Sequence, residues 1–278
     1  MPSPDALPEP TTEVGRAGLA ALLASPGTAL LGLDFDGTLA PIVPDPDAAR
    51  GHPGVPEVLT RLAGHGVRLA VVTGRPAATA VDYAGVAQVP GLVVLGHYGL
   101  ERWSGGEVTA PEDLSAVQEA RRRLPGVLDG AGAPEGTYVE DKGAAVAVHT
   151  RRTADPAHAF ESLRGPLTAL AEEVGLVVEP GRFVLELRPS GGDKGDAVRE
   201  LVAETGAAWV GFVGDDLGDL AAFDAVDELR AAGRAGLLVC SGSTEVTTLA
   251  ERADLVVDGP DGVVALLTAV ADRLDEAR

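Results

Sequence analysis

Residues 28–42 read TALLGLDFDGTLAPI, and this stretch decides the fold. Its first part is an apolar run, which predicts a buried β-strand over residues 28–33. The run ends at Asp34-Phe35-Asp36-Gly37-Thr38, where polar residues and a glycine predict a tight turn. Because side chains alternate along a strand, Asp34 and Asp36 point to the same side. The stretch therefore predicts two carboxyl groups at the carboxyl end of a buried strand.

On both sides of the insertion described below, the chain alternates between helical and strand patterns. Residues 54–63 carry apolar side chains at helical spacing, and further helices follow Lys194 and Asp216 and begin at Val263. Buried strands are predicted over residues 67–72, 92–95, 208–213, 236–240 and 254–257. Strands joined by helical crossovers lie parallel, so this pattern predicts an α/β domain built on a parallel sheet.

The alternation of helical and strand patterns changes after Trp103, and this change predicts an inserted domain of a different fold class. Helices are expected over residues 111–124 and 156–174, and strand-like alternation covers residues 138–150 and 176–188. We therefore expect a parallel-sheet core interrupted by an α+β insertion. The expected parts are a flexible N-terminal arm (1–17), a core (18–107 and 189–278) and the insertion (108–188).

Polar clusters stand at the ends of predicted core strands or at the start of a helix. They are Asp34-x-Asp36-Gly-Thr38, Thr73-Gly74-Arg75, Gly192-Asp193-Lys194-Gly195 and Gly214-Asp215-Asp216-x-x-Asp219. Each cluster alone also fits a structural role, as a turn or a helix cap. In an open parallel sheet, however, ligands bind at the carboxyl ends of the strands. The order of the clusters and their shared position favour one functional site.

The residue types in these clusters suit phosphate chemistry. A carboxylate such as Asp34 can attack phosphorus, and Asp36 can protonate a leaving oxygen and then deprotonate water. Thr73, with backbone N–H groups at a helix start, can hold a phosphate. Lys194 opens a helix, where the helix dipole disfavours a cation, so a bound anion explains it better than a structural role does.

The acidic residues of the last cluster predict a metal site. Asp215, Asp216 and Asp219 place three carboxylates within five residues. Beside Asp34 and Asp36 they would repel one another strongly unless a hard divalent cation neutralised the group. Oxygen ligands of this kind favour Mg²⁺.

Composition excludes some classes of function and limits others. The formal net charge is −20, which argues against binding to nucleic acid or to an anionic membrane. A single cysteine excludes an internal disulfide, and residues 1–12 do not resemble a signal peptide, so we expect a cytoplasmic protein. The expected partner is a small molecule, with no obligate protein partner evident. Only two of the 22 basic residues are lysines, Lys142 and Lys194, which is consistent with a chemical requirement at both.

Together the clusters resemble those of the haloacid dehalogenase-like (HAD) phosphatases, in the same order along the chain. The resemblance implies a Rossmann-like core with an inserted cap and catalysis through an aspartyl-phosphate. It implies Asp34 as the nucleophile and Asp36 as the general acid and base, with Thr73 and Lys194 holding the phosphoryl group. The implied ligands of Mg²⁺ are Asp34, the carbonyl of Asp36 and Asp215.

The chain is further similar to the trehalose-6-phosphate phosphatase family. The similarity lies in residues 33–42, 96–101, 140–151 and 185–195, which read LDFDGTLAPI, GHYGLE, EDKGAAVAVHTR and LELRPSGGDKG. It implies substrate contacts by Gly74, Arg75, His97, Glu140, Lys142, Arg151 and Glu186. Gly218 and Leu220 stand where the family usually has Thr and Glu, and Thr150 where it has an aromatic residue.

The leading hypothesis is hydrolysis of trehalose 6-phosphate to trehalose and phosphate, as a step of trehalose biosynthesis. A close alternative keeps the chemistry but takes another sugar phosphate, such as sucrose phosphate or a glucosyl- or mannosylglycerate phosphate. A phosphomutase and a non-catalytic sugar-phosphate sensor are two further alternatives. The sensor would be expected to lack Asp34 or Asp36, and both are present.

Overall fold

The chain divides into two compact units. The computed structural model describes residues 7–43, 45–111, 113–181, 183–242 and 247–278, so the first six residues of the expected arm lie outside it. One unit, called the core here, comprises Met1–Thr109 and Gly192–Arg278. The other, called the insertion, comprises Ala110–Gly191.

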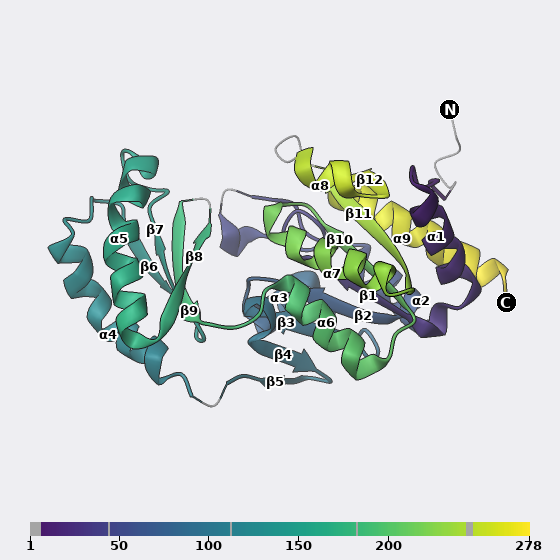
Figure 1. Ribbon diagram of the computed structural model, residues 1–278, viewed down its shortest axis with the longest axis horizontal. Helices are drawn as coiled ribbons and strands as arrows, with labels where there is room; N and C mark the ends of the chain where they lie inside the picture. Colours follow the sequence, from purple (N-terminus) through teal and green to yellow (C-terminus); the bar gives the residue numbers. More distant parts are fainter. Residues whose placement is uncertain (1–6, 44, 112, 182, 243–246) are drawn as a thin grey trace. The chain divides into compact units, whose positions relative to one another are not determined.

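The core is built on an eight-stranded sheet with the order β12-β11-β10-β1-β2-β3-β4-β5 (Figure 1). Neighbours from β12 to β3 pair in parallel, and β4 and β5 extend the sheet in antiparallel fashion. The strands are β1 (Ala29–Leu33), β2 (Arg68–Val72), β3 (Val93–Gly96), β4 (Glu101–Ser104), β5 (Glu107–Thr109), β10 (Trp209–Gly214), β11 (Ala235–Gly242) and β12 (Leu255–Asp258). The expected α/β class with a parallel sheet is confirmed, whereas the antiparallel β4–β5 edge was not predicted.

Helices cover both faces of this sheet because its central strands are apolar on both sides. Leu31 packs against the helices on one face of the sheet, and the adjacent Leu30 packs against the helices on the other face. The first layer is α1 (Glu13–Ala24), α2 (Val55–Gly64), α3 (Ala77–Ala84) and α9 (Gly259–Glu276). The second layer is α6 (Lys194–Thr205), α7 (Leu220–Ala231) and α8 (Thr247–Arg252). Short 3₁₀ turns lie at Pro26–Thr28 (η1), Pro46–Ala48 (η2), His97–Gly99 (η3) and Leu217–Asp219 (η4).

Helix α1 includes residues that the sequence analysis assigned to a flexible arm. Thr12 caps the helix by accepting a hydrogen bond from the Gly15 N–H, and its hydroxyl also bonds the buried Asp254 carboxylate. Residues 13–17 therefore form the first turns of a packed helix. The cause is a contact far along the chain, which local sequence does not reveal.

The insertion is a four-stranded antiparallel sheet, with the order β6-β7-β9-β8, packed on two helices. Its elements are β6 (Tyr138–Asp141), β7 (Val146–His149), β8 (Leu176–Gly181), β9 (Val184–Pro189), α4 (Ser115–Gly130) and α5 (Pro156–Val174). Val146, Val148, Leu185 and Leu187 face the helices and are fully buried. The alternate residues of these strands, which include Ala147 and Glu186, line the opposite face of the sheet.

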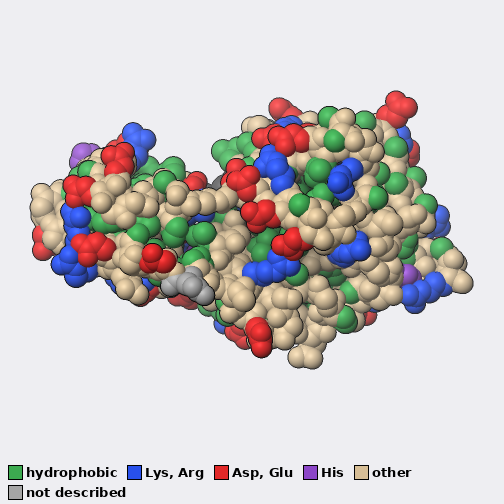
Figure 2. All heavy atoms as spheres, turned by 60° about the horizontal axis from the view of Figure 1, so that its bottom comes forward, with side chains coloured by type: hydrophobic (Ala, Val, Ile, Leu, Met, Phe, Trp, Pro, Cys, Tyr) green, Lys and Arg blue, Asp and Glu red, His purple; other side chains and the backbone are tan. Residues whose placement is uncertain are grey.

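Charges of both signs are interspersed on the side of the core that Figure 2 shows. Ion pairs also join helices of the core, such as Arg199–Glu228 between α6 and α7 and Arg252–Asp224 between α8 and α7. Among the helices of the described residues, none combines the length and the apolar character that a membrane span requires.

Gly18 lets α1 approach the sheet so closely that no side chain fits between them. A Cβ on Gly18 would lie 1.8 Å from the carbonyl oxygen of Gly236 in β11. The carbonyl of Gly18 also accepts a hydrogen bond of 2.7 Å from the indole N–H of Trp209. The absent side chain is thus a packing requirement at this position.

We expect Gly18→Ala to destabilise the core, because α1 would have to move away from β11. The cost of such overpacking is about 1–3 kcal/mol, which lowers the midpoint of thermal unfolding by several degrees. Gly64→Ala is the matched control, because Gly64 also lies in a helix but a Cβ there would meet nothing within 4 Å. Equal thermal midpoints for the two variants would contradict the packing argument.

Candidate active site

Parallel pairing of β1 and β10 brings two acidic motifs together at the carboxyl edge of the core sheet. Leu33 is the register partner of Val213, and the Asp34 N–H donates to the Val213 carbonyl at 2.9 Å. Asp215 follows the end of β10 by one residue. Asp34 and Asp215 are both buried, with 4% and 3% of their surface exposed.

The turn after β1 is shaped so that it passes directly against Asp215. Gly37 has φ +80°, which L side chains rarely adopt, and its Cβ position lies 2.0 Å from Oδ2 of Asp215. The Gly37 carbonyl accepts a 2.6 Å hydrogen bond from the buried Ser241 hydroxyl at the end of β11. Ser241 was not predicted as a site residue, although it directly follows the predicted strand 236–240, as the other polar motifs follow theirs.

Lys194 is placed among these carboxylates by the start of α6. Asp193 caps this helix, and Asp196 completes a reciprocal capping box. The Lys194 ammonium donates to Oδ1 of Asp34 at 2.7 Å and to Oδ1 of Asp219 at 2.6 Å. Burial alone would lower the pKa of Lys194, but Asp219 and Asp34 outweigh it and hold that pKa well above its usual value. Lys194 is therefore a buried cation beside Asp34.

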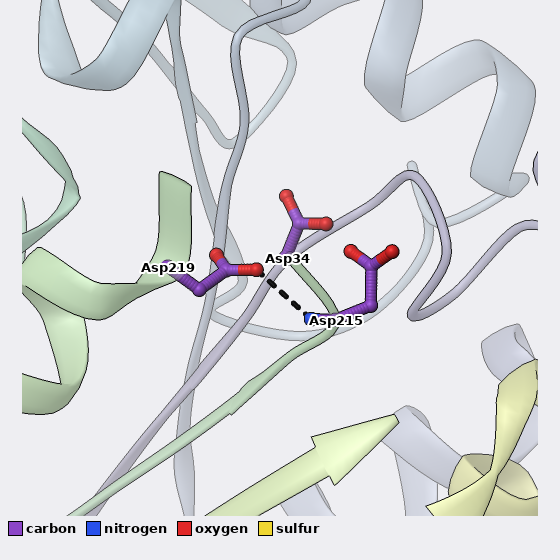
Figure 3. Close-up of side chains that lie close together, drawn as sticks. All are labelled: Asp34, Asp215 and Asp219. Atoms are coloured by element: carbon purple, nitrogen blue, oxygen red, sulfur yellow. Dashed lines mark hydrogen bonds between the residues drawn. The ribbon is translucent and has the colours of Figure 1, made fainter. Parts of the chain in front are cut away.

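Asp219 organises the last motif from a fully buried position. Its Oδ2 accepts hydrogen bonds from the N–H groups of Asp215, at 2.9 Å, and Asp216, at 3.2 Å. Figure 3 shows the first of these bonds, with Asp34 and Asp215 beside Asp219. The exposed Asp216 caps the η4 turn through the Gly218 N–H. Both carboxylate oxygens of Asp219 therefore already accept hydrogen bonds, from Lys194 and from the backbone. Its role in this structure is to hold these groups in place.

The carboxylates of Asp34, Asp215 and Asp219 form an acidic cluster that could hold a divalent cation. Each offers one oxygen, and these oxygens lie within 4.8 Å of one another. Burial raises the pKa of Asp215 to about 8, with Asp216 and Asp219 adding to the effect. Burial also raises the pKa of Asp34 well above its usual value, against the opposing effect of Lys194. Buried oxygens that resist carrying charge without a counter-ion fit a hard divalent metal ion.

The loop after β2 is fixed by the neighbouring β3 and by its own hydroxyl. The Thr73 N–H donates to the Leu95 carbonyl at 2.9 Å, and the Thr73 hydroxyl accepts from the Arg75 N–H at 3.1 Å. Thr73 is buried, and within the described part of the chain it forms no hydrogen bond with Asp34, Asp215 or Asp219. Next to it, half-buried Gly74 lies against the Tyr98 hydroxyl, 2.6 Å from the position of a Cβ.

His97 lies behind this loop with none of its surface exposed. The backbone N–H of His97 donates to the Arg75 carbonyl at 3.1 Å, and the ring Nε2 lies 3.8 Å from Oε1 of Glu101. The other Glu101 oxygen accepts from the Ala77 N–H at the start of α3. In this structure, the side chain of His97 supports the loop from inside the core.

Asp36 and Arg75 form a pair of their own. The guanidinium donates from Nε to Oδ2 and from Nη2 to Oδ1, both at 2.7 Å. The core thus brings together Asp34, Asp215 and Lys194, adds Asp219, and holds Asp36 separately on Arg75.

The remaining predicted residues belong to the insertion. Lys142 donates to Oε2 of Glu186 at 2.6 Å, and Oε2 of Glu140 lies 2.7 Å from Nε2 of His149. Arg151 is exposed just beyond β7. Lys142 and Glu186 form an ion pair within this unit, which sequence spacing alone could not indicate.

Comparisons with known proteins agree on one family. The family model described as "Trehalose-phosphatase" matches residues 32–258. Trehalose-phosphate phosphatases of Mycobacterium avium and Mycobacterium leprae are 33% and 32% identical to this chain, over 87% and 88% of it. The chain spans only 62% and 58% of the lengths of those two relatives. An uncharacterized glycosyl hydrolase of Mycobacterium tuberculosis is 37% identical over 70% of this chain, which spans 15% of that protein.

Solved structures share the fold at lower identity. The C-terminal domain of a trehalose-6-phosphate phosphatase from C. albicans has a TM-score of 0.72 at 22% identity, covering 96% of this chain and 99% of that one. A haloacid dehalogenase-like hydrolase from Bacteroides thetaiotaomicron has a TM-score of 0.55 at 19% identity, covering 90% of this chain and 99% of that one. The expected fold, a HAD-type core with an inserted unit, is confirmed.

Proposed function

The chain belongs to the trehalose-phosphatase family, and from that premise we propose that it hydrolyses trehalose 6-phosphate to trehalose and inorganic phosphate. The observation that carries the proposal is the placement of the Asp34 carboxylate beside both Lys194 and Asp215. A carboxylate next to a buried cation and an acidic cluster suits nucleophilic attack on a phosphate held by that cation and a metal ion.

In the proposed mechanism, Asp34 attacks phosphorus and the sugar oxygen leaves with a proton from Asp36, forming an aspartyl-phosphate. Water then attacks phosphorus and gives a proton to Asp36, and the Asp34 carboxylate is regenerated with release of phosphate. Lys194 offsets negative charge on the phosphoryl oxygens throughout. Thr73 and the N–H groups of its loop are proposed to hold the same oxygens.

The metal is proposed to be Mg²⁺, held by Asp34, the carbonyl of Asp36 and Asp215. These are hard oxygen donors, and Mg²⁺ retains waters when a site offers few protein ligands. When bound, the cation neutralises phosphoryl oxygens and orients them for in-line displacement. Asp219 keeps its hydrogen bonds to Lys194 and the backbone, and so fixes the site from behind.

The insertion is proposed to serve as the cap that selects the sugar. Glu140, Lys142, Arg151 and Glu186 are the proposed substrate contacts, since carboxylates accept from sugar hydroxyls and cations bind phosphate. The proposed cap is the insertion as the structure has it, Ala110–Gly191, and the expected bounds of 108–188 lie within two or three residues of it. Phosphate release from a panel of sugar phosphates tests the substrate, and faster hydrolysis of sucrose phosphate than of trehalose 6-phosphate would overturn it.

We expect Lys142→Ala to reduce hydrolysis of trehalose 6-phosphate much more than hydrolysis of a small aryl phosphate. Losing one charge-assisted contact should lower the specificity constant for the sugar phosphate by at least about tenfold. An aryl phosphate too small to reach the cap should be cleaved nearly as before. The measurement is kcat/KM for both substrates.

Arg164→Ala is the matched control, because Arg164 is an exposed cation of the same unit that pairs with Glu161 on α5. It should leave both rates unchanged. Equal losses on the two substrates for Lys142→Ala would indicate damage to the fold. No loss on either would contradict the proposed role of the cap.

A further inference from the structure

Arg75 forms a bidentate ion pair with the carboxylate of Asp36, called the fork here. Its Nε and Nη2 each donate to a different oxygen of Asp36, both at 2.7 Å. The side chain of Arg75 is 14% exposed, while that of Asp36 is 42% exposed. The cation is therefore the enclosed partner, and the carboxylate is the partner that a small molecule can reach.

The guanidinium is held in place by contacts that do not involve Asp36. Its Nη1 donates to the carbonyl of Pro46 at 3.0 Å. Its central carbon lies 5.3 Å from the centre of the Phe35 ring and 5.4 Å from that of Tyr83, within range of cation–π attraction. Arg75 is thus ordered by the core and offers Asp36 a preformed partner.

Most of the N–H donors of Arg75 are thereby committed to protein acceptors. A guanidinium has five N–H donors, and the hydrogen bonds above engage three of its nitrogens. A carboxylate has about four lone-pair positions, of which a fork occupies two. The remaining two leave Asp36 able to accept a proton from water while Arg75 holds it.

We propose that Arg75 is a positioning residue for the second half of the reaction, in which it fixes the Asp36 carboxylate that activates water. The inference rests on the proposed function. In this step the water oxygen bonds to phosphorus, and the bond from phosphorus to the Asp34 oxygen breaks. One water proton passes to Asp36, and the products are inorganic phosphate and the free Asp34 carboxylate. Without Arg75, Asp36 is not held in place and the aspartyl-phosphate persists.

The test measures nitrophenolate release from p-nitrophenyl phosphate by the Arg75→Gln variant in the presence of Mg²⁺. Nitrophenolate is a good leaving group that requires little protonation, so the first step should remain nearly as fast as in the wild type. We expect a burst of nitrophenolate equal to the enzyme concentration, then steady turnover reduced by at least about tenfold. Acid quenching and intact mass should show more phosphorylated protein than in the wild type. Arg75→Lys keeps the charge but loses the fork, and should accumulate an intermediate amount.

Arg50→Gln is the matched control. Arg50 also lies over the Tyr83 ring, at 4.3 Å, but its hydrogen bonds go to the Asp47 and Ala49 carbonyls. It should show wild-type turnover and no added burst. If Arg75→Gln is poorly folded, Arg75→Lys carries the test, and its phosphorylated fraction should exceed that of the wild type.

Two results would overturn the inference alone: wild-type turnover in both Arg75 variants, or reduced turnover without accumulation of phosphorylated protein. A wild-type protein that neither turns over nor becomes phosphorylated would overturn the proposed function, and the inference with it.

Discussion

Replacing Asp34 with asparagine is expected to reduce phosphate release by at least about a thousandfold. The amide has nearly the shape of the carboxylate but cannot attack phosphorus. It also removes one anionic oxygen from the acidic cluster, which weakens the metal site. The measurement is phosphate release from trehalose 6-phosphate with Mg²⁺ in excess.

The same substitution should leave the protein folded. Burial raises the pKa of Asp34 well above its usual value, which means that the folded protein disfavours the charged form. A neutral amide avoids this cost, although it loses the ion pair with Lys194. The thermal midpoint should therefore stay close to that of the wild type.

Asp82→Asn supplies the control, because Asp82 is an exposed aspartate on α3 outside the acidic cluster. It should keep full activity. Comparable turnover in purified Asp34→Asn and wild type would exclude the covalent mechanism, since no other carboxylate is proposed to attack phosphorus.

The core could be predicted because its determinants are local. An apolar run followed by polar residues marks the end of a strand wherever it occurs, and parallel strands place such ends at one edge. That rule alone placed Asp34 near Asp215. The antiparallel edge escaped because β4 and β5 are short and mostly exposed, with little apolar alternation to read. The Gly105–Gly106 pair between them, both at positive φ, was the available signal.

Which side chains pair with one another was harder to predict than which residues belong to the site. Arg75 follows a strand just as Thr73 does, and the family resemblance implied that it contacts the substrate. Its pairing with Asp36 depends on Pro46, Phe35 and Tyr83, which enclose the guanidinium from separate parts of the chain. The Lys142–Glu186 pair likewise joins residues 44 positions apart through the sheet of the insertion. Side-chain partners of this kind follow from three-dimensional packing, which a motif does not encode.

Removing divalent metal with a chelator is expected to abolish activity, and Mg²⁺ should restore it. Without a cation, the cluster of Asp34, Asp215 and Asp219 opposes the approach of phosphate, and the single charge of Lys194 offsets only part of this repulsion. Calcium should bind but support little turnover, because its looser coordination disturbs in-line geometry. Full activity in excess chelator would exclude the metal site.

The pH dependence of metal binding provides an independent check that does not require activity. Burial, with Asp216 and Asp219, raises the pKa of Asp215 to about 8 in the metal-free protein. Because the folded pKa lies above the ordinary value of 3.8, the folded protein binds more protons than the unfolded chain between these values. The contribution of Asp215 to stability is therefore lost as pH rises toward 8. Mg²⁺ competes with that proton, so its binding should tighten over the same interval.

We expect Mg²⁺ to raise the thermal midpoint more near the upper end of this interval than near its middle. Calorimetry in buffers of different ionisation enthalpy should show proton release on binding. A Mg²⁺ effect that is independent of pH would mean that the buried carboxylate of Asp215 does not bind the metal.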